Sequence, residues 1–210
     1  MTLLLHLDAS PRGDRSISRA LSKDFITHWK AAHPNDSVTY RDLGHYPVPL
    51  VDETWIAAAF SAPDQRTSEQ AASIAISDEL VDEVLAADCY VFSIPMYNFS
   101  HPAGFKAYID QIVRAGRTFS VEADGSYKGL VTGKKMLVIT ARSGSYRQGT
   151  AAHAYDLQEP YLRLIFGFMG IADITVIHAD NLAAGENARA QSLTQTQTAL
   201  QAVVEQWSAS

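Results

Sequence analysis

Apolar and polar positions along the chain follow two different periods. Short runs with the length and spacing of strands occupy residues 3–8, 37–43, 88–94, 135–140 and 173–179. Longer stretches with apolar positions three or four apart, typical of helices, occupy residues 17–33, 52–60, 67–86, 102–116, 160–169 and 186–207. A hairpin turned at Asp124-Gly125 is predicted over residues 118–127. Strands and helices therefore alternate through most of the chain.

This alternation predicts a parallel sheet with helices on both faces, joined by right-handed crossovers. The 210 residues suit one domain, which we expect to span residues 1–210. Five strands in a chain of this length favour the α/β, flavodoxin-like strand order 2-1-3-4-5 over a six-stranded dinucleotide-binding fold. In that order the carboxyl ends of the first, third and fourth strands meet at the point where open α/β sheets bind ligands.

Composition narrows the function classes. A net charge of −6, without a cluster of Lys and Arg, disfavours nucleic acid or an anionic membrane as a partner. No apolar run approaches the ~20 residues that a membrane-spanning helix needs. The single cysteine, Cys89, excludes an intramolecular disulfide and is consistent with the cytoplasmic location that we expect. The seven histidines lack paired ligand spacing, so no metal site is expected.

The loop after the first strand is rich in turn residues and hydroxyls. Ser10, Ser16 and Ser18 flank the predicted start of a helix, where backbone amides without acceptors and the helix dipole can hold a phosphate. A plain helix N-cap would use the same residue types. The spacing matches neither the GxxxxGK[ST] loop nor the GxGxxG fingerprint, so a nucleoside triphosphate or a conventionally bound NAD is not expected.

The turn after the third strand is aromatic. Met96, Tyr97, Asn98 and Phe99 lie between two prolines, and they offer ring faces together with an amide that both donates and accepts hydrogen bonds. These groups suit a planar heterocycle, although an ordinary strand-to-helix loop would read the same way.

The loop after the fourth strand contains Arg142, Ser143 and Gly144. Because Gly144 has no Cβ, a ligand can approach the backbone closely there. Such Ser- and Gly-rich loops are common without any function. The prediction of a site therefore depends on the three loops converging at the same edge of the sheet.

These stretches resemble the FMN-dependent NADH:quinone oxidoreductases, also called azoreductases. The most specific match is the Pro95-Met96-Tyr97-Asn98-Phe99 turn. Weaker matches are Ser10 with Ser16-Ile17-Ser18, Arg114-Ala115-Gly116 with Thr118-Phe119, Gly129-Leu130-Val131-Thr132-Gly133-Lys134-Lys135, and Pro160-Tyr161-Leu162 with Phe166-Gly167-Phe168. The family loop after the fourth strand usually carries two adjacent glycines, whereas here Ser143 precedes Gly144.

The resemblance implies a homodimer with one FMN per subunit and active sites at the dimer interface. It implies that Ser10, Ser16, Ile17 and Ser18 bind the FMN phosphate, that Met96, Tyr97, Asn98 and Phe99 hold the ring and ribityl chain, and that Arg142, Ser143 and Gly144 line its other edge. Phe119, Phe166 and Phe168 become the expected substrate contacts, the latter two as a lid reaching across the dimer.

The reaction implied is a ping-pong relay, in which a hydride passes from NADH or NADPH to the flavin and then to a quinone or azo compound. A flavin that carries the chemistry needs no catalytic side chain, and no acid–base dyad is evident in the sequence.

Two alternatives stay open. A flavodoxin-type electron carrier would bind FMN but no small substrate, and is expected to be a more acidic monomer. A response-regulator-like module would need an acidic pocket, and Asp8 has no acidic neighbour in the sequence.

Overall fold

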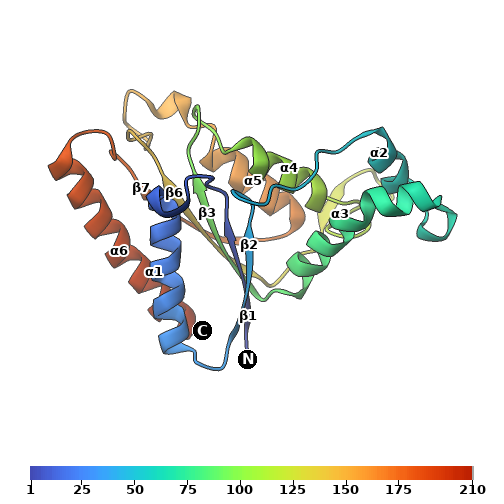
Figure 1. Ribbon diagram of the computed structural model, residues 1–210, viewed down its shortest axis with the longest axis horizontal. Helices are drawn as coiled ribbons and strands as arrows, with labels where there is room; N and C mark the ends of the chain where they lie inside the picture. The colour runs from blue at the N-terminus through green and yellow to red at the C-terminus, as the bar shows by residue number, and fades with distance from the viewer. Residues whose placement is uncertain (210) are drawn as a thin grey trace.

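A computed structural model describes residues 1–209 and places the main sheet as predicted (Figure 1). Its five strands are all parallel, in the order β2-β1-β3-β6-β7. Their bounds are β1 (Leu3–Asp8), β2 (Ser37–Asp42), β3 (Cys89–Pro95), β6 (Lys135–Ala141) and β7 (Asp173–Ala179). The predicted flavodoxin-like order 2-1-3-4-5 is confirmed, because β6 and β7 are the fourth and fifth strands of this sheet.

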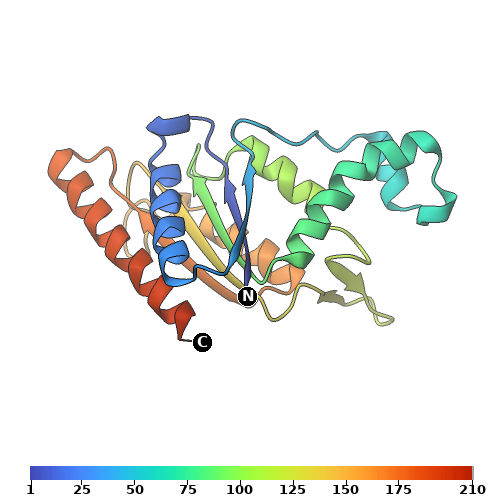
Figure 2. The same ribbon diagram turned by 60° about the horizontal axis from the view of Figure 1, so that its bottom comes forward.

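Helices cover both faces of the sheet (Figures 1 and 2). On one face lie α1 (Ile17–Ala32) and α6 (Glu186–Ser208), and on the other lie α3 (Ser68–Ala86), α4 (Ala103–Ile112) and α5 (Glu159–Met169). The short helix α2 (Glu53–Ala59) packs on the first half of α3, and both project beyond the sheet. None of the helices among residues 1–209 has the length and apolar character that crossing a membrane requires.

Two hydrophobic clusters account for these layers. One gathers around Phe92, Phe105 and Phe166 between the sheet and α3, α4 and α5, where the rings meet edge to face. The other gathers around Phe25 and Trp207 between the sheet, α1 and α6. The central strands β1, β3 and β6 lie between the two clusters and are buried on both faces. They therefore appear in the sequence as continuous apolar runs.

The predicted hairpin is confirmed as β4 (Phe119–Val121) and β5 (Tyr127–Gly129), which pair antiparallel. The helix before it, predicted to reach residue 116, ends at Ile112. Thr118 explains the early end, because its hydroxyl donates to the Ile112 carbonyl at 2.8 Å and accepts from the Arg114 amide at 2.9 Å. These bonds replace those that a longer helix would make.

Three short 3-10 helices were not predicted: η1 (Gly13–Arg15), η2 (Pro63–Gln65) and η3 (His153–Tyr155). Each lies in a loop, where apolar spacing gives no signal. The other predicted boundaries agree with the structure to within one or two residues.

Candidate active site

The loop after β1 leads into α1 through a helix cap. Ser16 is the N-cap, and its hydroxyl accepts from the Arg19 amide at 3.4 Å. The amides of Ile17 and Ser18 belong to the first turn of α1, where no helix carbonyl can accept from them. The hydroxyls of Ser16 and Ser18 lie 3.2 Å apart and are buried. This end of α1 therefore presents donors and the positive end of the helix dipole to an anion.

Arg19 and Gly44 both contact the Ser10 carbonyl of the same loop. The Arg19 Nε donates to the Ser10 carbonyl at 2.7 Å. Gly44 packs so closely that a Cβ built on it would lie 2.0 Å from the Ser10 carbonyl oxygen. Only glycine fits there, and the sequence alone gave no reason to connect these two residues.

The turn after β3 has an uncommon backbone. Asn98 and Phe99 have φ angles of 48° and 70°, in the left-handed region that non-glycine residues rarely adopt. Tyr97 and Ser100 exchange both backbone hydrogen bonds, at 2.9 and 3.0 Å, and so close the turn. Left-handed backbone at consecutive bulky residues concentrates at ligand sites, where surrounding contacts stabilise it.

The loop after β6 is organised by a buried ion-pair network. Arg142 is 1% exposed, and its Nε donates to Asp180 at 2.6 Å while one Nη donates to Asp156 at 2.8 Å. The other oxygen of Asp156 accepts from the amides of Gln158 and Glu159, at the start of α5. Burial raises the pKa of Asp180, but the hydrogen bond and charge of Arg142 outweigh it and hold that pKa below its ordinary value. The network ties the loop to two neighbouring segments.

A pocket of about 370 Å³ lies where these three loops meet. The predicted residues that line it come from all three loops: Ser10, Ser16, Ile17, Ser18, Met96, Tyr97, Arg142 and Ser143. We call it the strand-end pocket, because its floor is the carboxyl ends of β3 and β6 at Pro95 and Ala141. The convergence that the strand order predicted is therefore present.

Sequence reasoning missed four residues that line this pocket. Arg12 follows β1, Arg189 lies on the second turn of α6, and Leu182 and Ala183 belong to the segment between β7 and α6. Arg12 and Arg189 are exposed. The fifth strand ends beside the fourth, so its carboxyl-end segment could have been included from topology alone.

Three predicted residues border the strand-end pocket without lining it: Asn98, Phe99 and Gly144. Phe99 is 44% exposed and stacks on Tyr155, with ring centroids 5.1 Å apart. Tyr146 meets the Phe99 ring edge-on and lies 5.6 Å from the Arg142 guanidinium. An aromatic wall therefore connects the turn after β3 to the loop after β6.

The predicted substrate contacts separate into two groups. Phe166 is 1% exposed inside the core, against Phe92 and Phe105, so the single chain gives no support for its predicted place in a lid across the dimer. Helical spacing places Phe166 and Phe168 on different faces of α5, and only the latter faces the hairpin. Phe168 meets Phe119 at 4.7 Å between ring centroids, and Tyr127 at 5.4 Å. Phe119 and Tyr127 belong to the hairpin, which lies at lower right in Figure 2, away from the loop before α1 at the upper edge.

Other chemistry is not supported at this site. Among residues 1–209 no group of three or more His, Cys, Asp or Glu side chains could hold a metal ion. Burial raises the pKa of the Cys89 thiol to about 12, which makes it a poor nucleophile. Asp8 is buried and accepts from Ser22, Tyr40 and Ser93, so it does not form the open acidic pocket of a response regulator.

Comparison with known proteins decides the family. Residues 2–204 match the family described as having a flavodoxin-like fold. The chain is 62% identical over 208 residues to "FMN-dependent NADH:quinone oxidoreductase 2" of Trichormus variabilis, covering 99% of this chain and 100% of that one. The chain belongs to the FMN-dependent NADH:quinone oxidoreductases. A more distant relative of the same name, from Pseudomonas fluorescens, is 43% identical, with 97% of this chain and 100% of that one covered.

Solved structures agree with this membership. An azoreductase from Bacillus anthracis superimposes with a TM-score of 0.91 at 29% identity, covering 98% of this chain and 100% of that one. An FMN-dependent NADH-azoreductase from the same organism, solved in complex with FMN, superimposes with a TM-score of 0.89 at 25% identity, covering 98% and 99%. The fold is thus shared with both solved structures over nearly the whole chain.

Proposed function

We propose that this protein is an FMN-dependent oxidoreductase that takes electrons from NADH or NADPH and passes them to quinones or azo compounds. Full-length similarity to relatives with that name supports the activity. The observation that carries the proposal is the strand-end pocket, where a helix start, buried serines and three arginines meet beside a left-handed aromatic turn.

The phosphate end of FMN fits the first loop. Ser10, Ser16 and Ser18 would donate hydroxyls, and the amides of Ile17 and Ser18 would donate along the axis of α1. Arg12 and Arg189 would supply positive charge from two sides. A phosphate dianion needs several donors and compensating charge, and this pocket offers both.

The ribityl chain and ring fit the other two loops. Met96 and Tyr97 line the pocket next to the phosphate end, and Asn98 with Phe99 would extend that surface along the ring. The Nη2 atom of Arg142 is buried without an acceptor among residues 1–209, and it offers a charged donor to a carbonyl or hydroxyl of the cofactor. Ser143 and Gly144 would border the opposite edge.

FMN supplies the electron-transfer chemistry when bound, accepting a hydride from a nicotinamide and reducing the acceptor in turn. The residues of the chain position the ring, present its open face and exclude water behind it. Donor and acceptor would share that one open face and so bind alternately, which gives ping-pong kinetics.

We further propose that the active form is a homodimer. The hairpin that carries Phe119 lies away from the strand-end pocket of its own chain, and the Phe119 and Phe168 rings that meet there are partly exposed. A second copy that places this cluster beside the pocket would supply the substrate contacts that one chain lacks.

A spectroscopic titration distinguishes this function from that of an electron carrier. Purified protein should be yellow, NADH should bleach it without oxygen, and menadione or methyl red should restore the oxidised spectrum. Bleaching without such reoxidation would favour a flavodoxin-type carrier. Protein that stays colourless after incubation with FMN would reject the site.

A further inference from the structure

A second cavity lies outside the strand-end pocket, between α1 and the edge strand β2. It has a volume of about 600 Å³. It exists because α1 packs across β1, β3 and β6, whereas the face of β2 beside it has no helix over it. Val38 is therefore only half-buried, and Tyr40 is 51% exposed. We call this space the edge cavity.

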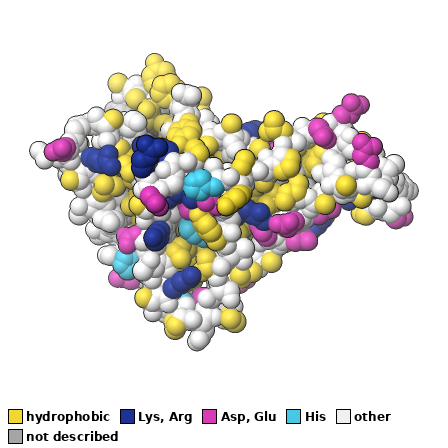
Figure 3. Space-filling view, in the orientation of Figure 1, with side chains coloured by type: hydrophobic (Ala, Val, Ile, Leu, Met, Phe, Trp, Pro, Cys, Tyr) yellow, Lys and Arg dark blue, Asp and Glu magenta, His cyan; other side chains and the backbone are white. Residues whose placement is uncertain are grey.

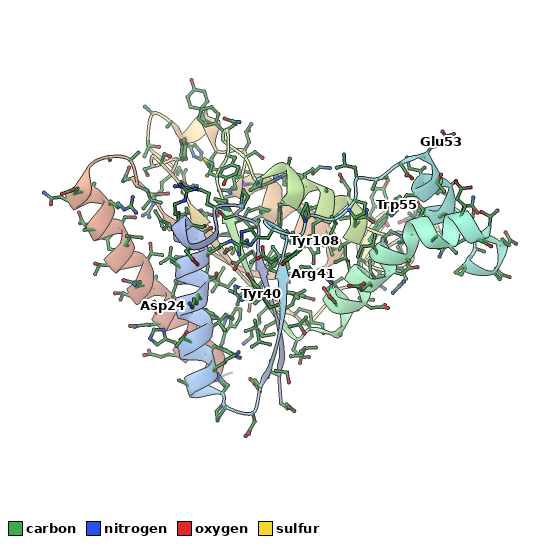
Figure 4. The ribbon with its side chains drawn as sticks, viewed as in Figure 1. Asp24, Tyr40, Arg41, Glu53, Trp55 and Tyr108 are labelled. Carbon is green, nitrogen blue, oxygen red and sulfur yellow. The ribbon has the colours of Figure 1, made fainter. Side chains whose placement is uncertain are left out.

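The inner wall of the edge cavity is aromatic and fixed in place. The His6 and Tyr40 rings lie 4.8 Å apart at 41°, and His6 is 6% exposed. The Tyr40 hydroxyl donates to Asp8 at 2.9 Å and accepts from Arg19 at 3.0 Å. Tyr40 thus lies on the α1 side of β2 and Arg41 on the α3 side, as Figure 4 shows. A ring held by two hydrogen bonds can receive a flat ligand with little loss of entropy.

The remaining walls combine apolar surface with free positive charge. Ile26 and Val38 provide the apolar part. Lys23 and Lys30 lie at the rim, two turns of α1 apart, about 10 Å along the axis. Both lysines are exposed, and neither has an ion-pair partner among residues 1–209. Lys and Arg side chains appear beside this hollow in Figure 3, around a His-containing patch.

The charges also limit what can bind. Asp8 and Asp14 line the end of the cavity nearer the first loop, so a ligand with several negative charges would be repelled there. One negative group at the lysine end avoids this repulsion. An apolar ring would then lie on Ile26, Val38 and Tyr40.

We propose that the edge cavity is a second small-molecule site, which takes a planar aromatic molecule bearing a single anionic group. It is separate from the strand-end pocket and shares only Ser16 with it. Arg19 connects the two, because it lines the edge cavity and donates to the Ser10 carbonyl in the first loop. A ligand in the edge cavity contacts the support of that loop without occupying the strand-end pocket.

Calorimetric titration of the FMN-incubated protein with 2-naphthoate, and with uncharged 2-naphthol, tests the site. We expect 2-naphthoate to bind about threefold to fivefold more tightly, the effect of one partly exposed charge pair. The double variant Lys23→Glu/Lys30→Glu should remove this preference. Lys128→Glu, which changes an exposed lysine on the hairpin, should keep it.

A second variant tests the cavity itself. Ala20→Trp places a large ring at the mouth from an exposed position on α1 and should abolish binding of both compounds. Unchanged 2-naphthoate affinity in both the double lysine variant and Ala20→Trp would overturn the proposal. So would displacement of FMN absorbance by 2-naphthoate, which would place the compound in the strand-end pocket. Failure of FMN itself to bind would count against the proposed function and leave this titration interpretable.

Discussion

Two arginines support the loops of the strand-end pocket, and they do so in different surroundings. Arg142 is 1% exposed, and its carboxylate partners Asp156 and Asp180 are 7% and 3% exposed. Arg19 has an 11% exposed side chain and donates to Asp42, which is 12% exposed, while the buried Asp8 carboxylate lies 3.6 Å away. Arg142 lines the pocket directly, whereas Arg19 acts through the Ser10 carbonyl.

The difference follows from where each loop leaves the sheet. The loop after β6 emerges between β3 and β7, so protein surrounds its support. The loop after β1 emerges beside the edge strand β2, whose face on the α1 side has no helix over it. When a buried ion pair loses one partner, the other charge stays buried and unpaired. When an ion pair lies near water, the remaining charge can be hydrated instead. We therefore expect the two arginines to differ in the size and in the kind of their effects.

Arg142→Met should have the largest effect. It leaves Asp156 buried without a cation and leaves Asp180 with Arg147 alone, which should destabilise the fold by about 3–5 kcal/mol. Urea unfolding would measure the loss. Because the unpaired Asp156 carboxylate causes most of it, Arg142→Met/Asp156→Asn should lose less than the sum of the two single variants. Simple additivity would contradict this explanation.

Arg19→Met should have a smaller effect on stability and a visible one on cofactor binding. Removing its bonds to Ser10, Tyr40 and Asp42 should cost about 1–3 kcal/mol, with water replacing part of the loss. The Ser10 carbonyl loses its donor, so FMN affinity, measured by fluorescence quenching, should fall. Arg15→Met changes an exposed arginine of the same loop and should leave both quantities unchanged. Equal FMN affinity in the two variants would show that Arg19 does not position the loop.

The contrast between the arginines also shows which features of the structure could be predicted from the sequence and which could not. Strand order and the convergence of three loops followed from apolar periodicity, because those patterns are local. The partners of Arg142 are 14 and 38 residues away, and Asp42 is 23 residues from Arg19, so no local pattern pairs them. The burial of Phe166 was not predicted, because a family motif does not show which face of α5 packs on the sheet. The left-handed backbone at Asn98 could not be predicted either, because Asn and Phe also adopt other conformations.

The smallest expected effect is on the stability of the fold at acid pH. Burial alone would raise the pKa of Asp42. The hydrogen bonds that Asp42 accepts from Arg19 and His45 outweigh burial and bring that pKa down to about 2. The folded pKa lies below the unfolded value of about 4. The contribution of this carboxylate to stability is therefore fully present above pH 4 and is lost as the pH falls through 2.

Asp42→Asn isolates that contribution, because the other carboxylates with lowered pKa values remain in the variant: Asp8, Asp124, Glu159 and Asp180. Urea midpoints of the two proteins should differ by a constant amount between pH 7 and pH 5, and the difference should shrink as the pH approaches 2. A difference that stays constant down to pH 2 would mean that Asp42 acts through its shape and hydrogen bonds rather than its charge. The support of the first loop would then be no more sensitive to pH than the neutral parts of the fold, and the electrostatic distinction between the two arginines would be lost.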